Sequence, residues 1–179
     1  MRLNRLWTTV DGAIADLGDS SRSRRADAGA WIWGHGYDHF SADERPRLVE
    51  ALGPVAEADP DPAARAQAIA ALVLLRVDGS VDLALAALRD PYWGMRMIVA
   101  SQIESTGDPR VVDALIDLLN DEDGYVREAA AIGLDRQRDP RALEPLRAML
   151  RGERDRGAKK SAKQAIRVLE TRAGSPGGN

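Results

Sequence analysis

The sequence predicts an all-α solenoid, a stack of helix pairs that repeats every 31 residues. Three observations predict it: apolar residues recur at helical spacing, turn residues interrupt them at regular intervals, and charged residues return at a fixed distance. Hydrophobic residues make up 44% of the 179 residues, but aromatic residues only 4%. Alanine and leucine must therefore fill most of the core, as closely stacked helices require.

The stretch from Gly107 to Leu134 shows the repeating unit most clearly. Asp108 and Pro109 suit a helix start, because aspartate caps free N–H groups and proline fits the first turn. The apolar residues that follow recur at helical spacing: Val112, Leu115, Ile116 and Leu119. An acidic loop over residues 120–124 then leads into a second stripe of apolar and small residues. The unit is helix, short loop, helix.

Two charged positions mark the period. The arginines lie 31 residues apart, at Arg65, Arg96 and Arg127. An aspartate stands six residues before each of them, at Asp59, Asp90 and Asp121. A fourth copy begins at residues 139–141 and fits with one inserted residue, which puts Lys159 at the arginine position. We therefore expect about four helix pairs.

The repetition of these charges argues for a structural role. An active site is needed once, whereas a joint is needed in every repeat. Each aspartate lies in a turn, where it can cap the second helix or pair with an arginine of a neighbouring repeat. An arginine in the first turn opposes the helix dipole and therefore needs an acceptor. We expect Arg96 and Arg127 to contact a carboxylate or a turn carbonyl, with Asp90 and Asp121 the leading candidates, and we predict no catalytic residues.

The segments DEDGYVREAAA (121–131) and GDPRVVDALIDLL (107–119) resemble HEAT-like repeats, in particular the short variety named after phycobilisome lyases. The resemblance covers roughly Ser41 to Arg172 and is strongest from Asp78 to Leu150. That family includes bilin lyases, chaperones, DNA glycosylase relatives and plain scaffolds. The resemblance therefore implies the fold without selecting a function.

We divide the chain into an N-terminal capping helix with an aromatic segment (1–40), a HEAT-like solenoid (41–172) and a flexible tail (173–179). Apolar residues from Leu3 to Leu17 predict a first helix of about sixteen residues, which would cover the solenoid end. A polar, basic loop follows over residues 18–25. The first solenoid helix begins either at a capping box formed by Ser41 and Glu44 or at Pro46. Further helices are expected near residues 62–76, 80–89, 92–105, 109–119, 124–136, 140–151 and 155–172.

The segment from residue 30 to residue 40 holds four of the eight aromatic residues and both histidines. A metal site there would use His35, His39 and Asp38. However, Gly34 and Gly36 disfavour the helix that would align the two histidines, and the chain has no cysteine or third histidine. We therefore predict no metal or cofactor, and expect an aromatic cap over the first repeat, with a ligand or partner contact as the alternative.

Composition excludes several classes of function. The absence of cysteine excludes disulfides and thiolate chemistry, and a net charge of −3 argues against a general nucleic-acid binder. Residues 111–150 carry five basic and nine acidic side chains, whereas residues 151–179 carry eight basic and three acidic ones. We interpret the basic end as a solvated helix that complements the acidic loops, with docking of an acidic partner as the alternative.

Asp11 and Asp16 argue against a signal peptide, and no apolar run is long enough to span a membrane, so a cytoplasmic protein is expected.

In HEAT-like solenoids the second helices line the concave face, where partners bind. When this sequence is aligned to that pattern, an exposed strip of apolar residues crosses two repeats, with polar residues beside it. The predicted partner-binding residues are Trp93, Met97, Ile98, Tyr125, Glu128, Ile132 and Lys160.

The leading hypothesis is a non-catalytic scaffold or adaptor that binds another protein or a peptide on this face. One alternative is a bilin-lyase-like protein, with segment 31–40 as the candidate tetrapyrrole contact. A second is a relative of the HEAT-like DNA glycosylases, which the resemblance associates with a basic surface. The inferred face carries Lys160 but little other positive charge, so nucleic-acid binding is disfavoured.

Overall fold

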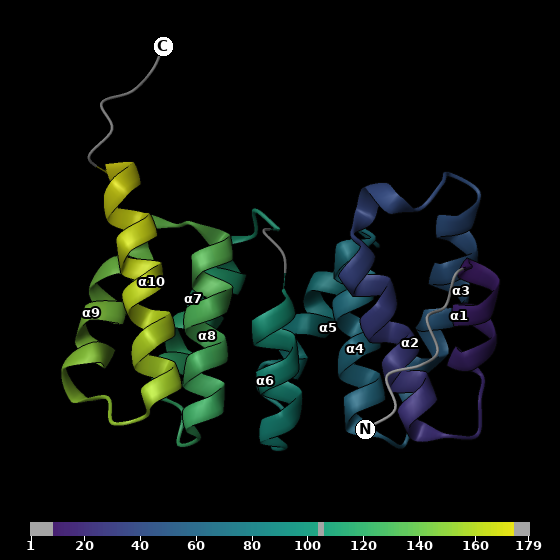
Figure 1. Cartoon of the computed structure of the whole chain (residues 1–179), viewed down its shortest axis with the longest axis horizontal. Helices are drawn as coiled ribbons and strands as arrows, with labels where there is room; N and C mark the ends of the chain where they lie inside the picture. The colour runs from purple at the N-terminus through teal and green to yellow at the C-terminus, as the bar shows by residue number, and fades with distance from the viewer. Residues whose placement is uncertain (1–8, 104–105, 174–179) are drawn as a thin grey trace, which may run out of the picture. The chain divides into compact units, whose positions relative to one another are not determined.

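The computed structural model describes residues 9–103 and 106–173, and every regular element in those ranges is helical (Figure 1). The α-helices are α1 (Val10–Leu17), α2 (Arg22–His35), α3 (Glu44–Ala58), α4 (Pro62–Leu74), α5 (Ser80–Ala87), α6 (Trp93–Gln102), α7 (Pro109–Asp117), α8 (Gly124–Gln137), α9 (Leu143–Gly152) and α10 (Arg156–Ala173). Short 3-10 helices are η1 (Tyr37–His39), η2 (Leu118–Asn120) and η3 (Pro140–Ala142). Within these ranges, none of the helices has both the length and the apolar character needed to cross a bilayer.

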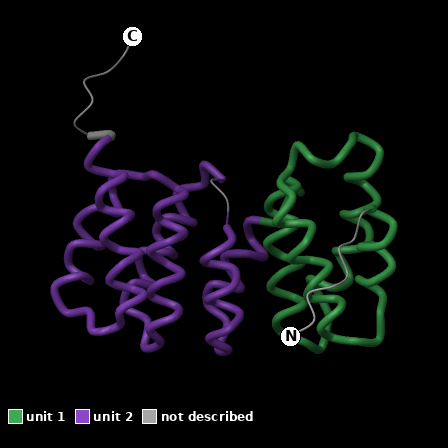
Figure 2. The backbone as a smooth tube through the Cα atoms, in the orientation of Figure 1, with its two compact units in different colours: residues 1–80 green, residues 81–179 purple. Residues whose placement is uncertain are grey.

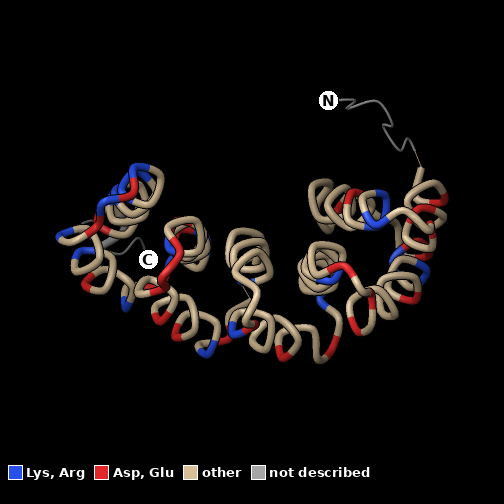
Figure 3. Tube along the Cα trace, turned by 90° about the horizontal axis from the view of Figure 1, so that it is seen from below, with Lys and Arg blue, Asp and Glu red and all other residues tan. Residues whose placement is uncertain are grey.

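The helices pack into two compact units, residues 1–80 and 81–179 (Figure 2). In the first unit, α2 packs on α4, and each of them packs on the helix that precedes it, α1 or α3. In the second unit, α8 packs between α6 and α10, which leaves α5, α7 and α9 in a second layer (Figure 3). The all-α solenoid is confirmed, and the four expected helix pairs are present from α3 to α10.

Small residues bring the second helices of each pair close together. A Cβ atom added to Gly133 of α8 would lie 2.5 Å from the carbonyl oxygen of Ala100 in α6. In the first unit, a Cβ on Gly29 of α2 would lie 2.9 Å from the Cβ of Gln67 in α4. Alanines fill much of the remaining interior of α4 and α8. The expectation that small residues dominate the packing is therefore met at both sites.

The N-terminal segment differs from the expectation. The described residues before position 40 form two α-helices and the 3-10 helix η1, and α2 begins at Arg22, inside the expected loop. The reason is a turn that starts the helix: the carboxylate of Asp19 accepts a hydrogen bond from the backbone N–H of Ser21 at 2.7 Å. The expected apolar residues Leu3, Leu6 and Trp7 lie outside the described residues, as do residues 174–179 of the expected tail. The proposed boundaries at 40 and 172 stay predictions.

Helix α3 begins at Glu44 with Asp43 at its N-cap position, so it starts between the two expected positions. The backbone N–H of Ser41 donates to the Glu44 carboxylate at 2.9 Å, as in half of a capping box. Pro46 is the third residue of the helix, where a missing N–H costs nothing because that group has no partner within the helix.

Candidate partner-binding face

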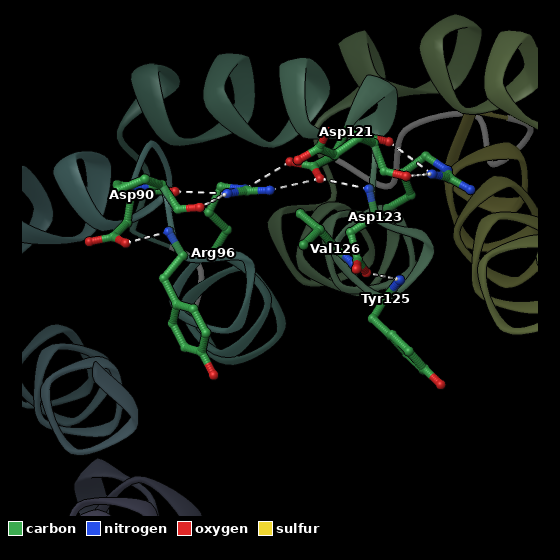
Figure 4. A network of polar contacts seen from close by, with 10 residues as sticks. Asp90, Arg96, Asp121, Asp123, Tyr125 and Val126 are labelled. Atoms are coloured by element: carbon green, nitrogen blue, oxygen red, sulfur yellow. Dashed lines mark hydrogen bonds and ion pairs between the residues drawn. The ribbon is translucent and has the colours of Figure 1, made fainter. Parts of the chain in front are cut away.

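A ladder of charged residues holds neighbouring turns in fixed positions, as Figure 4 shows around Arg96. The Nε and Nη2 atoms of Arg96 donate to the carboxylate of Asp121, at 2.8 and 3.0 Å. Its Nη1 atom donates to the backbone carbonyl of Asp90 at 2.8 Å. Arg96 thus joins the turn of its own repeat to the turn of the next one.

The same geometry recurs at two other arginines. Arg127 donates to the carboxylate of Glu153 at 2.7 and 2.9 Å and to the carbonyl of Asp121 at 2.8 Å. In the first unit, Arg25 donates to the carboxylate of Asp59 and, at 2.8 Å, to the carbonyl of Asp19. The prediction that Arg96 and Arg127 contact a carboxylate or a turn carbonyl is confirmed. Each makes both contacts, and the carboxylate comes from the following repeat.

Sequence reasoning missed two members of the ladder. Arg25 stands 40 residues before Arg65, and Glu153 stands 32 residues after Asp121 with a different side chain, so neither fits the 31-residue period. A spacing of six between an acid and a base is nevertheless kept, from Asp19 to Arg25 and from Glu153 to Lys159. That shorter spacing is the signal that could have identified both.

The acidic residues of the ladder also organise the turns that contain them. The carboxylate of Asp121 accepts the N–H of Asp123 at 3.0 Å, and that of Glu153 accepts the N–H of Asp155 at 2.7 Å. A different aspartate caps the helix that follows: Asp123 accepts the N–H of Tyr125 at 2.8 Å. Asp121 therefore stabilises the turn, whereas Asp123 caps the helix that follows it.

These contacts keep the ladder acids ionised. The hydrogen bonds from Arg127 lower the pKa of Glu153 from 4.5 to about 2, against the opposing effect of burial. Burial of Asp121 acts to raise its pKa, but hydrogen bonds from Arg96 and from the N–H of Asp123 outweigh it and leave that pKa below its ordinary value. The ladder is a set of charged joints, and nothing in its geometry sets up proton transfer.

The turns also bring exposed aromatic side chains together on the layer formed by α6, α8 and α10. Trp93, the first residue of α6, is 40% exposed, and Tyr125, the second residue of α8, is 65% exposed. Their rings stack with centroids 6.0 Å apart and an angle of 30° between their planes. Tyr92 extends this cluster, with its ring centroid 6.0 Å from that of Trp93.

The other predicted partner-binding residues lie on the same three helices. Met97, Ile98 and Ile132 are partly exposed, and Lys160 is exposed. Glu128 is half-buried and accepts a hydrogen bond from the Ser161 hydroxyl at 3.3 Å, so it is tied to α10.

Tyr92 was missed because its exposure depends on a local detail that no repeat pattern reveals. A Cβ on Gly94 would lie 2.6 Å from the Tyr92 ring, so glycine at that position makes room for it.

An open groove of about 680 Å³ lies between α8 and α10. It is lined by Ile132, Asp135, Arg156, Lys159, Lys160, Ser161, Lys163, Gln164 and Arg167. The sequence-based expectation that this face carries little positive charge besides Lys160 is wrong, because four further basic residues line the groove. The helical spacing of these residues was readable from the sequence.

The aromatic segment of the first unit forms a compact ring cluster. Phe40 is buried, and its ring lies 6.0 Å from that of Trp31. No single helix aligns the two histidines: α2 continues through Gly34 but ends at His35, and Gly36 has a φ of 79°. The turn after α2 nevertheless brings the rings of His35 and His39 within 4.6 Å. Across the described residues, no group of three or more histidine, cysteine, aspartate or glutamate side chains could hold a metal ion.

Comparison with known proteins agrees with this repeated architecture. The sequence profile of HEAT repeats matches residues 49–135 and again residues 81–167. The chain belongs to the HEAT-repeat family. No curated protein matches it in sequence.

Two solved structures share this HEAT-repeat fold. One is the complex of CpcE and CpcF of phycocyanin lyase from Nostoc sp. PCC7120, with 21% identity, a TM-score of 0.65, and coverage of 94% of this chain and 67% of that one. The other is an engineered protein, with 16% identity, a TM-score of 0.58, and coverage of 90% of this chain and 79% of that one. At these identities the likeness extends to the fold alone.

Proposed function

We propose that this HEAT-repeat protein is a non-catalytic scaffold or adaptor that binds another protein or a peptide on the face formed by α6, α8 and α10. The observation that carries the proposal is the exposed, stacked pair of Trp93 and Tyr125. Large aromatic side chains left in water lose the free energy that burial provides, and they are the commonest anchors of protein interfaces. Both rings are held at helix starts that the ladder fixes.

The other predicted partner-binding residues belong to the same proposed binding face. Met97, Ile98 and Ile132 offer partly exposed apolar surface next to the aromatic pair. Lys160 supplies a charged edge, and Glu128 braces α8 against α10. A partner side chain that covers the aromatic pair would therefore contact apolar surface at the centre and charge at the rim, the usual arrangement in protein interfaces.

The proposal is tested by finding the partner through this face. A photo-crosslinking amino acid in place of Tyr125 marks a protein that touches it, and binding of that protein is then measured with Trp93→Ala and Tyr125→Ala. Removal of a central aromatic anchor costs about 2 kcal/mol or more, so each variant should bind at least tenfold more weakly with unchanged far-UV helical signal. Trp33→Ala, in the first unit, is the matched control and should bind normally. Normal binding by both test variants would contradict the proposal and direct attention to residues 31–40.

The ring cluster at Trp31, His35, His39 and Phe40 favours a second candidate, the handling of a tetrapyrrole chromophore. Flat aromatic faces stack on such a molecule, and imidazole N–H groups can donate to its carboxylates. Mixing the protein with a bilin tests this directly. A shift of the bilin absorbance that is lost in Trp31→Ala would support it, whereas an unchanged spectrum would contradict it.

A further inference from the structure

One face of α10 carries a continuous basic stripe. Its five members are separated by three, one, three and four residues, so they lie on the same side of the helix: Arg156, Lys159, Lys160, Lys163 and Arg167. All five line the groove between α8 and α10. Figure 3 shows lysine and arginine gathered along this last helix of the second unit.

The stripe differs from the paired arginines of the second unit because, in the part of the chain that the structure describes, its side chains form no ion pair. Arg96, Arg127 and Arg147 each form an ion pair with a carboxylate. Among the described residues, none of the five stripe residues forms such a pair. Lys159 shows the contrast best, since it occupies the ladder position at which Arg127 and Arg96 hold a carboxylate. The groove lining therefore carries five basic side chains and one carboxylate, that of Asp135.

The opposite wall of the groove has a different character. Ile132 of α8 is partly exposed there, so this wall offers an apolar side chain to a ligand. The same helix carries Glu128 and Asp135. Of these two, Asp135 lines the groove. Its carboxylate disfavours the uniformly charged backbone of a nucleic acid, but it does not disfavour a ligand with one acidic side and one apolar side.

The length of the basic stripe indicates how long a ligand must be to contact all five residues. From Arg156 to Arg167 the helix rises by about 16 Å, since each residue adds about 1.5 Å. A ligand helix of about eleven residues covers that distance and can present a carboxylate on each turn.

We propose that the groove between α8 and α10 binds an acidic, amphipathic helical segment of the protein partner, with its carboxylates on the basic stripe and its apolar side toward Ile132. This inference rests on the proposed function and adds the chemistry of the partner to it. Opposite charge at the rim guides encounter and fixes orientation, while the apolar contacts contribute affinity.

The test uses the whole chain and a fluorescein-labelled synthetic peptide of about twelve residues, long enough to span the stripe. Glutamate occupies one side of its helix and leucine the adjacent side, and a second peptide has lysine in place of every glutamate. Fluorescence anisotropy measures the affinity of both peptides at about 50 mM and about 300 mM salt, since charge pairing weakens as salt shortens the screening length.

The informative variant is Lys160→Glu with Lys163→Glu. Its matched control is Arg151→Glu with Arg154→Glu, two exposed residues outside the groove that change the net charge by the same amount. We expect the glutamate peptide to bind at least tenfold more tightly than the lysine peptide, and more weakly in high salt. The groove variant should bind it at least tenfold more weakly, with the control within twofold of the unmodified protein.

Several results would overturn the inference: no binding of the glutamate peptide at low salt, equal losses in the groove variant and its control, or tighter binding of a single-stranded DNA of equal charge. The last result would make the groove a nucleic-acid site. Failure here is separable from failure of the proposed function. If Trp93→Ala weakens binding of the crosslinked partner and the groove variant does not, the aromatic face stands and only the acidic segment is wrong.

Discussion

Replacement of Arg96 by alanine tests the ladder most directly. The substitution removes two hydrogen bonds to the Asp121 carboxylate and two to the backbone carbonyls of Asp90 and Pro91. The side chains of Arg96 and Asp121 are only 11% and 9% exposed, so the carboxylate is left largely buried without its cation. Removing one partner of a buried ion pair costs about 3–5 kcal/mol, and the position of this pair at the edge of a turn places the expected loss near the lower end.

The expected loss of about 3 kcal/mol corresponds to a melting temperature lower by about 6–12 °C for a chain of this size. The free energy of unfolding is measured by urea titration with far-UV circular dichroism. Arg110→Ala is the matched control, because Arg110 also pairs with two carboxylates but its side chain is 59% exposed. Exposed pairs contribute about 0–1 kcal/mol, so this variant should unfold almost like the original protein.

The comparison of the two arginines can refute the reasoning. Equal losses from Arg96→Ala and Arg110→Ala would show that burial does not set the strength of these pairs. A double replacement of Arg96 and Asp121 gives a second check. Because the two residues act as a pair, the double variant should lose less stability than the sum of the single losses.

Two further outcomes are expected. Since the pKa of Glu153 is lowered to about 2 in the folded protein from 4.5, its contribution is present above that ordinary value and is lost as the pH falls toward 2. The difference in unfolding free energy between the original protein and Glu153→Gln should therefore be largest above about pH 5 and shrink on acidification in urea titrations; a constant difference would contradict the pairing. Gly133→Ala should destabilise by about 1–3 kcal/mol in the same assay, because the added methyl group meets the Ala100 carbonyl. Gly53→Ala, whose added Cβ meets nothing within 4 Å, is its control.

Much of the fold could be predicted because each repeat carries the same local signals. Asp108 and Pro109 begin a helix for reasons that lie within a few residues, and those signals return wherever the pattern does. The start of α2 could not be predicted in this way. Arg25 belongs to the ladder, but the longer loop after α2 moves it out of period, and the residues around it have the composition of a loop.

The candidate site could be predicted less completely from the sequence than the fold. The exposed positions of Trp93 and Tyr125 follow from the repeat, whereas the ring of Tyr92 depends on the space beside Gly94. The basic groove was missed for a different reason. The fourth copy was aligned with its inserted residue, but of the basic residues of α10 only Lys160 was assigned to the exposed face, although Lys163 and Arg167 follow it at helical spacing.

The order of arginine and acid in the ladder affects how the repeat array can gain further repeats. At Arg96 and at Arg127 the joint is built from the arginine of one repeat and an acid of the next. Residues 90–120 contain Arg96 and, at the position equivalent to Asp121, Asp90. A tandem duplication of that segment would supply an acid for Arg96 and a new arginine for Asp121, and no other residue would need to change. Genetic duplication can thus lengthen the array by one repeat in a single event, with every new junction already chemically matched.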